Sequence, residues 1–372
     1  MSLPKTFKRA VFTSAGSPLV IEEATLIPPG PTEILVKVEA CGVCYSDVFA
    51  QSNAMGGGFP IVPGHEIIGR VAATGDKVTG WNIGDRIGGA WHGGHDGTFL
   101  FKLLLYLVLQ MPNSDRTIGT CKPCRKGSYQ MCDNRVVNGV TKGGGYAEYC
   151  LINAEAAVHV PSTVPAAKYA PILCAGVSVF NSIRHMDIRA GETVAIQGLG
   201  GLGHMAIQYA NRMGYRVVAI SRDSQKEKFA RELGAHEYID SSREDAGAAL
   251  KRLGGATLVV STAPSAEAMT PLLKGLGILG KLLMLSVPGE VPFDTAVMLT
   301  YALSVQVWPS GHSIDTEEAI AFTELQNINC MIEEFPLERA NDAFGRNFPL
   351  FSRTVFELKT DVIYRGDVER DS

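Results

Sequence analysis

Short apolar runs separated by turn residues dominate the first 150 residues of the chain. They are rich in Val and Gly and are divided by stretches such as TGDKVTGWNIGD at 74–85. Apolar runs bounded by Gly, Pro, Asn and Asp are typical of β-strands. The strands expected on this pattern are ILVKVEACGV (34–43), IIGRVAATG (67–75), DRIGGAW (85–91) and YAEYCLI (146–152). The pattern predicts a small, irregular barrel built mostly from antiparallel strands.

From about residue 165 the pattern changes to alternating strand-like and helix-like segments. Strands that alternate with helices of this length predict a parallel sheet with right-handed crossovers, and therefore an α/β fold. The expected strands are 193–197, RVVAIS (216–221), EYID (237–240), ATLVVST (256–262) and GKLLMLS (280–286). The expected helices are HMAIQYANRMG (204–214), SQKEKFARELGA (224–235) and a later one around TEEAIAFTEL (316–325).

Composition narrows the class of protein. The chain has 372 residues, of which 46% are hydrophobic and 19% charged, and this is enough for two globular domains, each with its own core. The net charge of −4 and the lack of a basic run argue against nucleic-acid binding. The N-terminus lacks the apolar core of a signal peptide, and the apolar run at 99–111 is too short to span a bilayer, so we expect a cytoplasmic protein without a membrane anchor. In that compartment, cysteines are more often metal ligands or buried small residues than disulfide partners.

A glycine-rich turn follows the first strand of the α/β part. Its glycines are Gly198, Gly200, Gly201 and Gly203, and they open the first helix. In this strand–turn–helix context, a GxGxxG pattern indicates a dinucleotide site, because the glycines permit the turn and the approach of a pyrophosphate to the helix N-terminus.

The end of the next strand bears on which dinucleotide binds. Ser221 stands where an acidic residue would hold the ribose hydroxyls of NAD, and Arg222 and Lys226 are suited to a 2′-phosphate. Asp223 would oppose such a phosphate only if its side chain turned inward. We therefore expect NADP(H) to be favoured over NAD(H); the alternative is that Arg222 and Lys226 are merely a solvated start of a helix.

Three further motifs carry metal-ligand residues. They are CGVCYSD (41–47), PGHE (63–66) and PILCAG (171–176). Together with the glycine fingerprint, these segments resemble the zinc-dependent, medium-chain alcohol dehydrogenase family, over residues 10 to about 340. The resemblance implies that Cys44, His65 and Cys174 bind a catalytic zinc. Two thiolates and one imidazole suit a catalytic zinc, which keeps its fourth position open for water or substrate.

The resemblance also assigns roles to neighbouring residues. Ser46 is expected to act in catalysis by passing a proton onward, and Asp47 to orient the histidine ligand. Glu66 lies close to the metal in the family, although a structural role is an equal alternative. Phe49 stands where many members have a proton-relaying histidine, so the proton must leave through water or the cofactor ribose. Trp91 corresponds to an aromatic wall of the substrate pocket, or packs in the core. Cys41 is expected to be a buried small residue, and Tyr45 replaces the basic residue or histidine often found near the pyrophosphate.

A second zinc is suggested by a cluster of cysteines. Family members with a structural zinc carry four cysteines spaced C-x2-C-x2-C-x7-C, and Cys121, Cys124 and Cys132 match the last three. If residues 99–120 are removed, Asp96 falls at the first position and could bind through oxygen. We hypothesise that these residues are an unremoved in-frame intron; the alternative is a genuine insertion, such as an apolar helix that covers a subunit surface or contacts a partner.

The resemblance implies a GroES-like, mostly-β catalytic domain and a Rossmann domain with a doubly wound parallel sheet. The expected bounds are 1–160 for the catalytic domain, 161–305 for the Rossmann domain and 306–372 for a segment that returns to the catalytic domain. The expected function is zinc-dependent hydride transfer between a nicotinamide cofactor and an alcohol, aldehyde or ketone, by a homo-oligomer. Two alternatives are a zinc-free reductase of the same superfamily, and a catalytically impaired or non-catalytic dinucleotide-binding homologue if 99–120 is expressed. The sequence does not identify the substrate.

Overall fold

The computed structural model describes residues 3–95, 121–346 and 353–357. The predicted insertion and Asp96 lie outside these residues. The described chain divides into two compact units. The first holds the residues up to Leu173 and those from Ile332 onward except 349–352, and the second runs from Cys174 to Met331.

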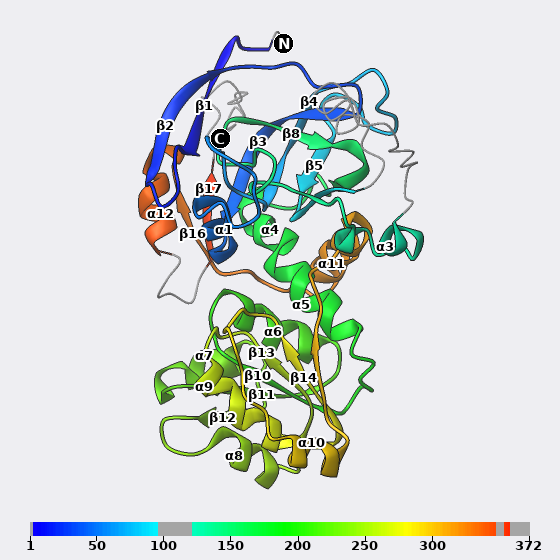
Figure 1. Cartoon of the computed structure of the whole chain (residues 1–372), viewed down its shortest axis with the longest axis vertical. Helices are drawn as coiled ribbons and strands as arrows, with labels where there is room; N and C mark the ends of the chain where they lie inside the picture. Colours follow the sequence, from blue (N-terminus) through cyan, green and yellow to red (C-terminus); the bar gives the residue numbers. More distant parts are fainter. Residues whose placement is uncertain (1–2, 96–120, 347–352, 358–372) are drawn as a thin grey trace, which may run out of the picture. The chain divides into compact units, whose positions relative to one another are not determined.

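The first unit is organised around a seven-stranded sheet (Figure 1). Its strand order is β16-β17-β3-β4-β5-β9, with β8 also paired to β3. The pairs are antiparallel except β16 with β17, which confirms the predicted mostly antiparallel barrel. The central strand β3 (Glu33–Val43) is buried along almost its whole length, because it has strands on both sides. Its residues Val36 and Val38 pack in one core with Ile67, Ile87 and Ile152.

The other elements of the first unit are short, as expected for strands interrupted by glycine and proline. Its strands are β1 (Thr6–Phe12), β2 (Leu19–Thr25), β4 (Ile67–Thr74), β5 (Arg86–Gly89), β6 (His92–Gly94), β7 (Val136–Val137), β8 (Tyr149–Asn153), β9 (Ala157–His159), β16 (Ile332–Phe335) and β17 (Arg353–Glu357). Its α-helices are α1 (Val48–Gln51), α3 (Lys122–Arg125), α4 (Ala166–Tyr169) and α12 (Ala340–Arg346). Its 3₁₀ helices are η1 (Tyr45–Asp47), η2 (Tyr129–Met131), η3 (Ala154–Ala156), η4 (Ala170–Leu173) and η7 (Leu337–Arg339).

The second unit is a six-stranded sheet with strand order β12-β11-β10-β13-β14-β15, and every pair in it is parallel. Strands and helices alternate along the chain, so the predicted doubly wound parallel sheet is confirmed. Its strands are β10 (Thr193–Gln197), β11 (Arg216–Ser221), β12 (Glu237–Asp240), β13 (Ala256–Ser261), β14 (Leu276–Met284) and β15 (Ser304–Val307). Its α-helices are α5 (Ala175–Arg184), α6 (Gly201–Arg212), α7 (Glu227–Glu232), α8 (Ala246–Arg252), α9 (Ala266–Met269), α10 (Thr295–Tyr301) and α11 (Ser313–Leu325), and its 3₁₀ helices are η5 (Ser224–Lys226) and η6 (Thr270–Gly275).

The boundaries between the two units lie after Leu173 and after Met331, whereas the predicted bounds were 160 and 305. Helix α11 belongs to the second unit, because it packs against two helices there. The ring of Phe322 lies 5.1 Å from that of Phe180 in α5 and 5.9 Å from that of Tyr209 in α6. The Tyr209 hydroxyl also lies 2.5 Å from the Thr323 hydroxyl oxygen. The chain therefore returns to the first unit at Ile332, later than predicted.

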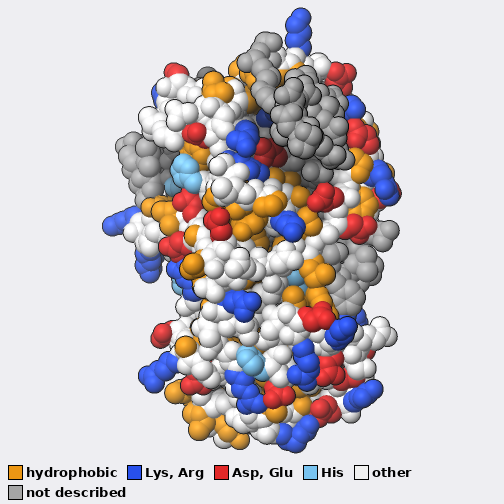
Figure 2. All heavy atoms as spheres, turned by 180° about the vertical axis from the view of Figure 1, so that it is seen from behind, with side chains coloured by type: hydrophobic (Ala, Val, Ile, Leu, Met, Phe, Trp, Pro, Cys, Tyr) orange, Lys and Arg blue, Asp and Glu red, His pale blue; other side chains and the backbone are white. Residues whose placement is uncertain are grey.

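The surface carries charges of both signs. On the face shown in Figure 2, acidic and basic side chains are interspersed over the described residues. Within the described part of the chain, none of the helices has the length and apolarity needed to cross a bilayer.

Candidate metal centre

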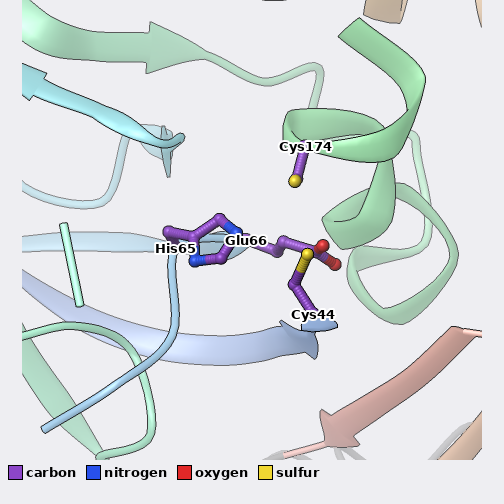
Figure 3. Close-up of side chains that lie close together, drawn as sticks. All are labelled: Cys44, His65, Glu66 and Cys174. Carbon is purple, nitrogen blue, oxygen red and sulfur yellow. The ribbon is translucent and has the colours of Figure 1, made fainter. Parts of the chain in front are cut away.

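Four side chains from three separate segments converge in one place (Figure 3). One ligand atom from each of Cys44, His65, Glu66 and Cys174 lies within 4.8 Å of the others. Cys44 follows β3, His65 and Glu66 precede β4, and Cys174 follows η4 as the residue that caps α5. The first three are buried and Cys174 is partly exposed. The cluster thus brings together the three predicted zinc ligands and Glu66.

Glycines next to the ligands allow this close approach. A Cβ atom on Gly42 would lie 1.7 Å from Oε2 of Glu66, so only glycine leaves room for that carboxylate. Gly64, directly before His65, has a φ of +100°, a conformation that side chains other than hydrogen rarely adopt. Substitution of either glycine would displace a cluster residue.

His65 is held by a buried carboxylate. Its Nδ1 atom lies 3.1 Å from Oδ1 of Asp47, and both side chains are fully buried. Burial alone lowers the pKa of His65, but the charge of Asp47 and then the Cys44 thiol more than offset it and raise the pKa to about 9. The edge-on ring of Trp91 packs against the imidazole at 4.9 Å, and Phe49 packs against Trp91 at 6.3 Å. Asp47 thus contacts the histidine, while Trp91 and Phe49 form an aromatic wall beside it.

The donor set fits zinc. Nε2 of His65 is buried and makes no hydrogen bond of good geometry to any described residue. A buried ring nitrogen is costly when unpaired. It lies in a group with two thiols and a carboxylate, which are zinc-ligand types. Bound zinc would satisfy this nitrogen.

The remaining predicted residues of these motifs lie around the cluster. Ser46 is in η1, two residues after Cys44, and is partly exposed. Cys41 is fully buried in β3 and is outside the cluster. Tyr45 is exposed.

A second group consists of Cys121, Cys124 and Cys132, whose sulfur atoms lie within 4.8 Å of one another. The Sγ atoms of Cys121 and Cys132 are 3.8 Å apart, and the backbone N–H of Asn134 donates to Sγ of Cys132 over 3.3 Å. The pKa of Cys124 is raised by burial and then by the two neighbouring thiols. Three sulfur atoms this close together are suited to a soft cation, which binds the thiolate forms. The predicted fourth ligand, Asp96, lies outside the described residues.

The predicted dinucleotide turn connects β10 to α6. Gly198 has a φ of +90°, and a Cβ atom on Gly203 would lie 1.8 Å from the carbonyl oxygen of Gly198. Gly200 caps α6, which begins at Gly201, and a Cβ atom on Gly200 would meet no atom within 4 Å. Gly198 and Gly203 therefore shape the turn, while the space at Gly200 is open.

The residues predicted to select the dinucleotide lie where β11 ends. Ser221 is the last residue of β11 and is buried, and Arg222 is exposed. The Asp223 carboxylate accepts a hydrogen bond of 2.9 Å from the backbone N–H of Gln225, which caps η5. Lys226 is partly buried, and burial lowers its pKa. Asp223 is thus engaged in a local cap.

One residue of the centre was missed by the sequence analysis. Tyr146 is fully buried, and its hydroxyl donates a hydrogen bond of 2.7 Å to Oδ2 of Asp47. The available signal was the run GGGYAEYC (143–150), in which three glycines precede an aromatic residue of a strand-like segment.

Comparison with known proteins identifies the family. Residues 30–162 match the alcohol dehydrogenase GroES-like domain, and residues 201–324 match the zinc-binding dehydrogenase family. The chain is 61% identical over 342 residues to alcohol dehydrogenase patD of Penicillium expansum, covering 92% of this chain and 94% of that protein. It is also 61% identical over 344 residues to alcohol dehydrogenase notN of Aspergillus sp. (strain MF297-2), covering 92% and 95% of the two chains.

A solved structure shares the fold of this chain. Acetophenone reductase from Geotrichum candidum NBRC 4597, in complex with NAD, superposes with a TM-score of 0.78 at 27% identity, covering 96% of this chain and 98% of that one. The fold and the matched domains define a zinc-dependent oxidoreductase that uses a nicotinamide cofactor. The chain belongs to the zinc-dependent, medium-chain alcohol dehydrogenase family, whose substrates are small alcohols or carbonyl compounds.

Proposed function

We propose that Cys44, His65 and Cys174 hold the catalytic zinc of this enzyme, with Glu66 close to the metal. The observation that carries the proposal is the convergence of their four ligand atoms within 4.8 Å. Bound there, zinc supplies a Lewis acid for the oxygen of an alcohol or carbonyl substrate. The alternative of a catalytically impaired homologue gains no support from the comparisons.

The surrounding residues have separate tasks in this proposal. Asp47 engages Nδ1 of His65 and leaves Nε2 as the ligating nitrogen. Ser46, near Cys44 and partly exposed, moves a proton between the substrate and solvent. Phe49 has no atom that carries a proton, so the proton from Ser46 leaves through water or the cofactor ribose. Trp91 and Phe49 offer an apolar wall to the substrate.

The experiment compares two buried cysteines. Cys44→Ala is expected to lose one equivalent of zinc and about a thousandfold in kcat/KM, because Lewis-acid stabilisation is worth several kcal/mol and each 1.36 kcal/mol is tenfold. Cys330→Ala, a buried cysteine of the second unit, serves as the matched control and keeps both. Metal analysis and turnover of both variants test the proposal; unchanged zinc and turnover in Cys44→Ala would contradict it.

We further propose that NADP(H) is favoured over NAD(H), bound at the turn of Gly198, Gly200, Gly201 and Gly203. Support comes from Ser221 at the end of β11, from the exposed Arg222, and from the capping role that engages Asp223. Arg222→Ala is expected to lower kcat/KM for NADPH about tenfold and to change that for NADH little, since a guanidinium–phosphate contact is charge-assisted. Lys228→Ala removes an exposed cation of α7 and is the control. A wild-type preference for NADH would refute the proposal.

We also propose a second, structural zinc, because three sulfur atoms converge. Its ligands would be Cys121, Cys124 and Cys132, with Asp96 as the fourth.

A homo-oligomer is proposed because β15 is an edge strand of the described sheet. The exposed apolar residues Ile278, Leu299 and Val307 lie on β14, α10 and β15, near this edge. A molar mass from light scattering of at least twice 39.9 kDa tests the oligomer. The cytoplasmic location stays a prediction.

A further inference from the structure

Tyr146 connects the two segments of the first unit that provide Cys44 and His65. Its hydroxyl donates to Oδ2 of Asp47 over 2.7 Å, and the same oxygen accepts from the backbone N–H of Cys44 over 2.9 Å. The other carboxylate oxygen of Asp47 lies 3.1 Å from Nδ1 of His65. The four groups thus form a continuous chain from a phenol to an imidazole, with the carboxylate at its centre.

The backbone around Tyr146 is fixed to the segment before His65. Three consecutive N–H groups, those of residues 144–146, donate to carbonyl oxygens of residues 62–64 with N···O distances of 2.8–3.0 Å. The tyrosine ring packs on Gly64, where an added Cβ atom would lie 2.5 Å from it. The position of the phenol is therefore set by backbone contacts, and its hydroxyl is presented to Asp47 without freedom to move away.

The Tyr146 hydroxyl contributes more to the hydrogen bonding of the Asp47 carboxylate than to the packing of the core. Asp47 is fully buried, and burying a carboxylate is costly unless its oxygens accept hydrogen bonds. Burial and the Asp47 charge raise the pKa of Tyr146, so the phenol keeps its proton and donates. A phenylalanine ring would fill the same space, but it would leave Oδ2 of Asp47 with the Cys44 N–H alone among the hydrogen bonds described for it.

We propose that Tyr146 is a positioning residue of the metal centre: its hydroxyl holds the Asp47 carboxylate in the orientation that fixes Cys44 and His65 for zinc. The proposal rests on the proposed ligand set. It adds to the site a residue that touches neither zinc nor substrate and acts only through Asp47. Outer partners of metal ligands of this kind set how tightly the metal is held.

The experiment measures zinc release, not turnover. Tyr146→Phe is compared with Tyr209→Phe, which removes the hydroxyl of another fully buried tyrosine, bonded to Thr323 in the second unit. The time course of zinc transfer to an excess of chelator is followed in both variants. The kinetic phase of zinc release that is absent from Cys44→Ala is assigned to the catalytic site. We expect zinc release in this phase to be about tenfold faster in Tyr146→Phe, because losing a hydrogen-bond partner behind a metal ligand weakens metal binding at least about tenfold. The rate should be unchanged in Tyr209→Phe. The absorption bands of the cobalt-substituted site should shift only in Tyr146→Phe.

A double-mutant cycle with Asp47→Ala, which removes both acceptor oxygens, tests the route of the effect. If Tyr146 acts through Asp47, Tyr146→Phe adds little to the release rate once the carboxylate is absent. Equal release rates in the two tyrosine variants would overturn the proposal, as would full additivity with Asp47→Ala. It would also be overturned if Tyr146→Phe failed to fold while Tyr209→Phe folded, since the hydroxyl would then serve the core. A wild-type protein without the catalytic phase would instead refute the proposed ligand set.

Discussion

The cluster of Cys44, His65, Glu66 and Cys174 draws its atoms from distant parts of the sequence, whereas the group of Cys121, Cys124 and Cys132 lies within one short segment. The distant ligands are arranged by β3, by the turn before β4 and by the end of η4. The local ligands are arranged by α3 and η2, which are single turns. A cluster assembled from distant segments depends on the sheet that joins them, while a local one depends on its own turns and on its metal.

The support around the two groups differs as well. His65 contacts a buried carboxylate, and that carboxylate has two further donors, from Cys44 and Tyr146. In the local group, the sulfur of Cys132 accepts a hydrogen bond of 3.3 Å from the backbone N–H of Asn134. The first group is thus held by protein contacts, and we expect a metal bound there to contribute mainly chemistry. The second is expected to need its metal for its own order, as structural zinc sites do.

The largest expected effect that sharpens this comparison is on stability. Cys124→Ser should lose one equivalent of zinc and about 3 kcal/mol of stability, because binding energy at a structural site is folding energy. In a chain of 372 residues that corresponds to a fall in Tm of roughly 4 °C, because the entropy of unfolding grows with chain length. Turnover per remaining zinc should stay within about threefold, since the chemistry is at the other group.

The control for this change is Cys150→Ser, which places the same hydroxyl at a buried cysteine of β8 outside both groups. Differential scanning calorimetry and metal analysis measure the two variants. Equal Tm values and equal zinc contents would remove the distinction between a structural and a catalytic group.

A smaller effect is expected when the support of the catalytic group is weakened. Asp47→Asn keeps the shape but removes the charge that faces His65. Its single amide oxygen can face either His65 or the two donors Cys44 and Tyr146, so one side must lose its acceptor. Zinc affinity at this site should fall about 10- to 100-fold, whereas zinc at the cysteine group should be retained. Competition with a chelator measures both affinities.

Asp245→Asn is the matched control, because Asp245 caps α8 in the second unit through a hydrogen bond from the Ala248 N–H. It should leave both zinc affinities unchanged. Loss of zinc from both groups in Asp47→Asn would show that the variant unfolds the unit, and the contrast drawn here would fail.

Much of the fold was predictable because local patterns and tertiary structure agree. The predicted strands RVVAIS and EYID are β11 and β12 to the residue, since each is a short apolar run bounded by turn residues. The strands β1 and β2 were not singled out, because they form a separate two-stranded sheet whose partly exposed faces mix charged and apolar residues. The second unit extends to Met331, past the expected 305, and the contact of Phe322 with Phe180 and Tyr209 that joins α11 to it has no signature in sequence spacing.

The sequence by itself determined the kinds of ligand, the glycine turn and the two fold types, because each depends on residue identity at fixed local spacing. The family resemblance implied which ligands meet, but only the tertiary structure decided how closely the atoms of Cys44, His65, Glu66 and Cys174 approach, and that the phenol of Tyr146 reaches Asp47. These contacts join residues far apart in the chain. Their geometry follows from the register of strands and from glycine turns packed backbone against backbone, which no single segment encodes.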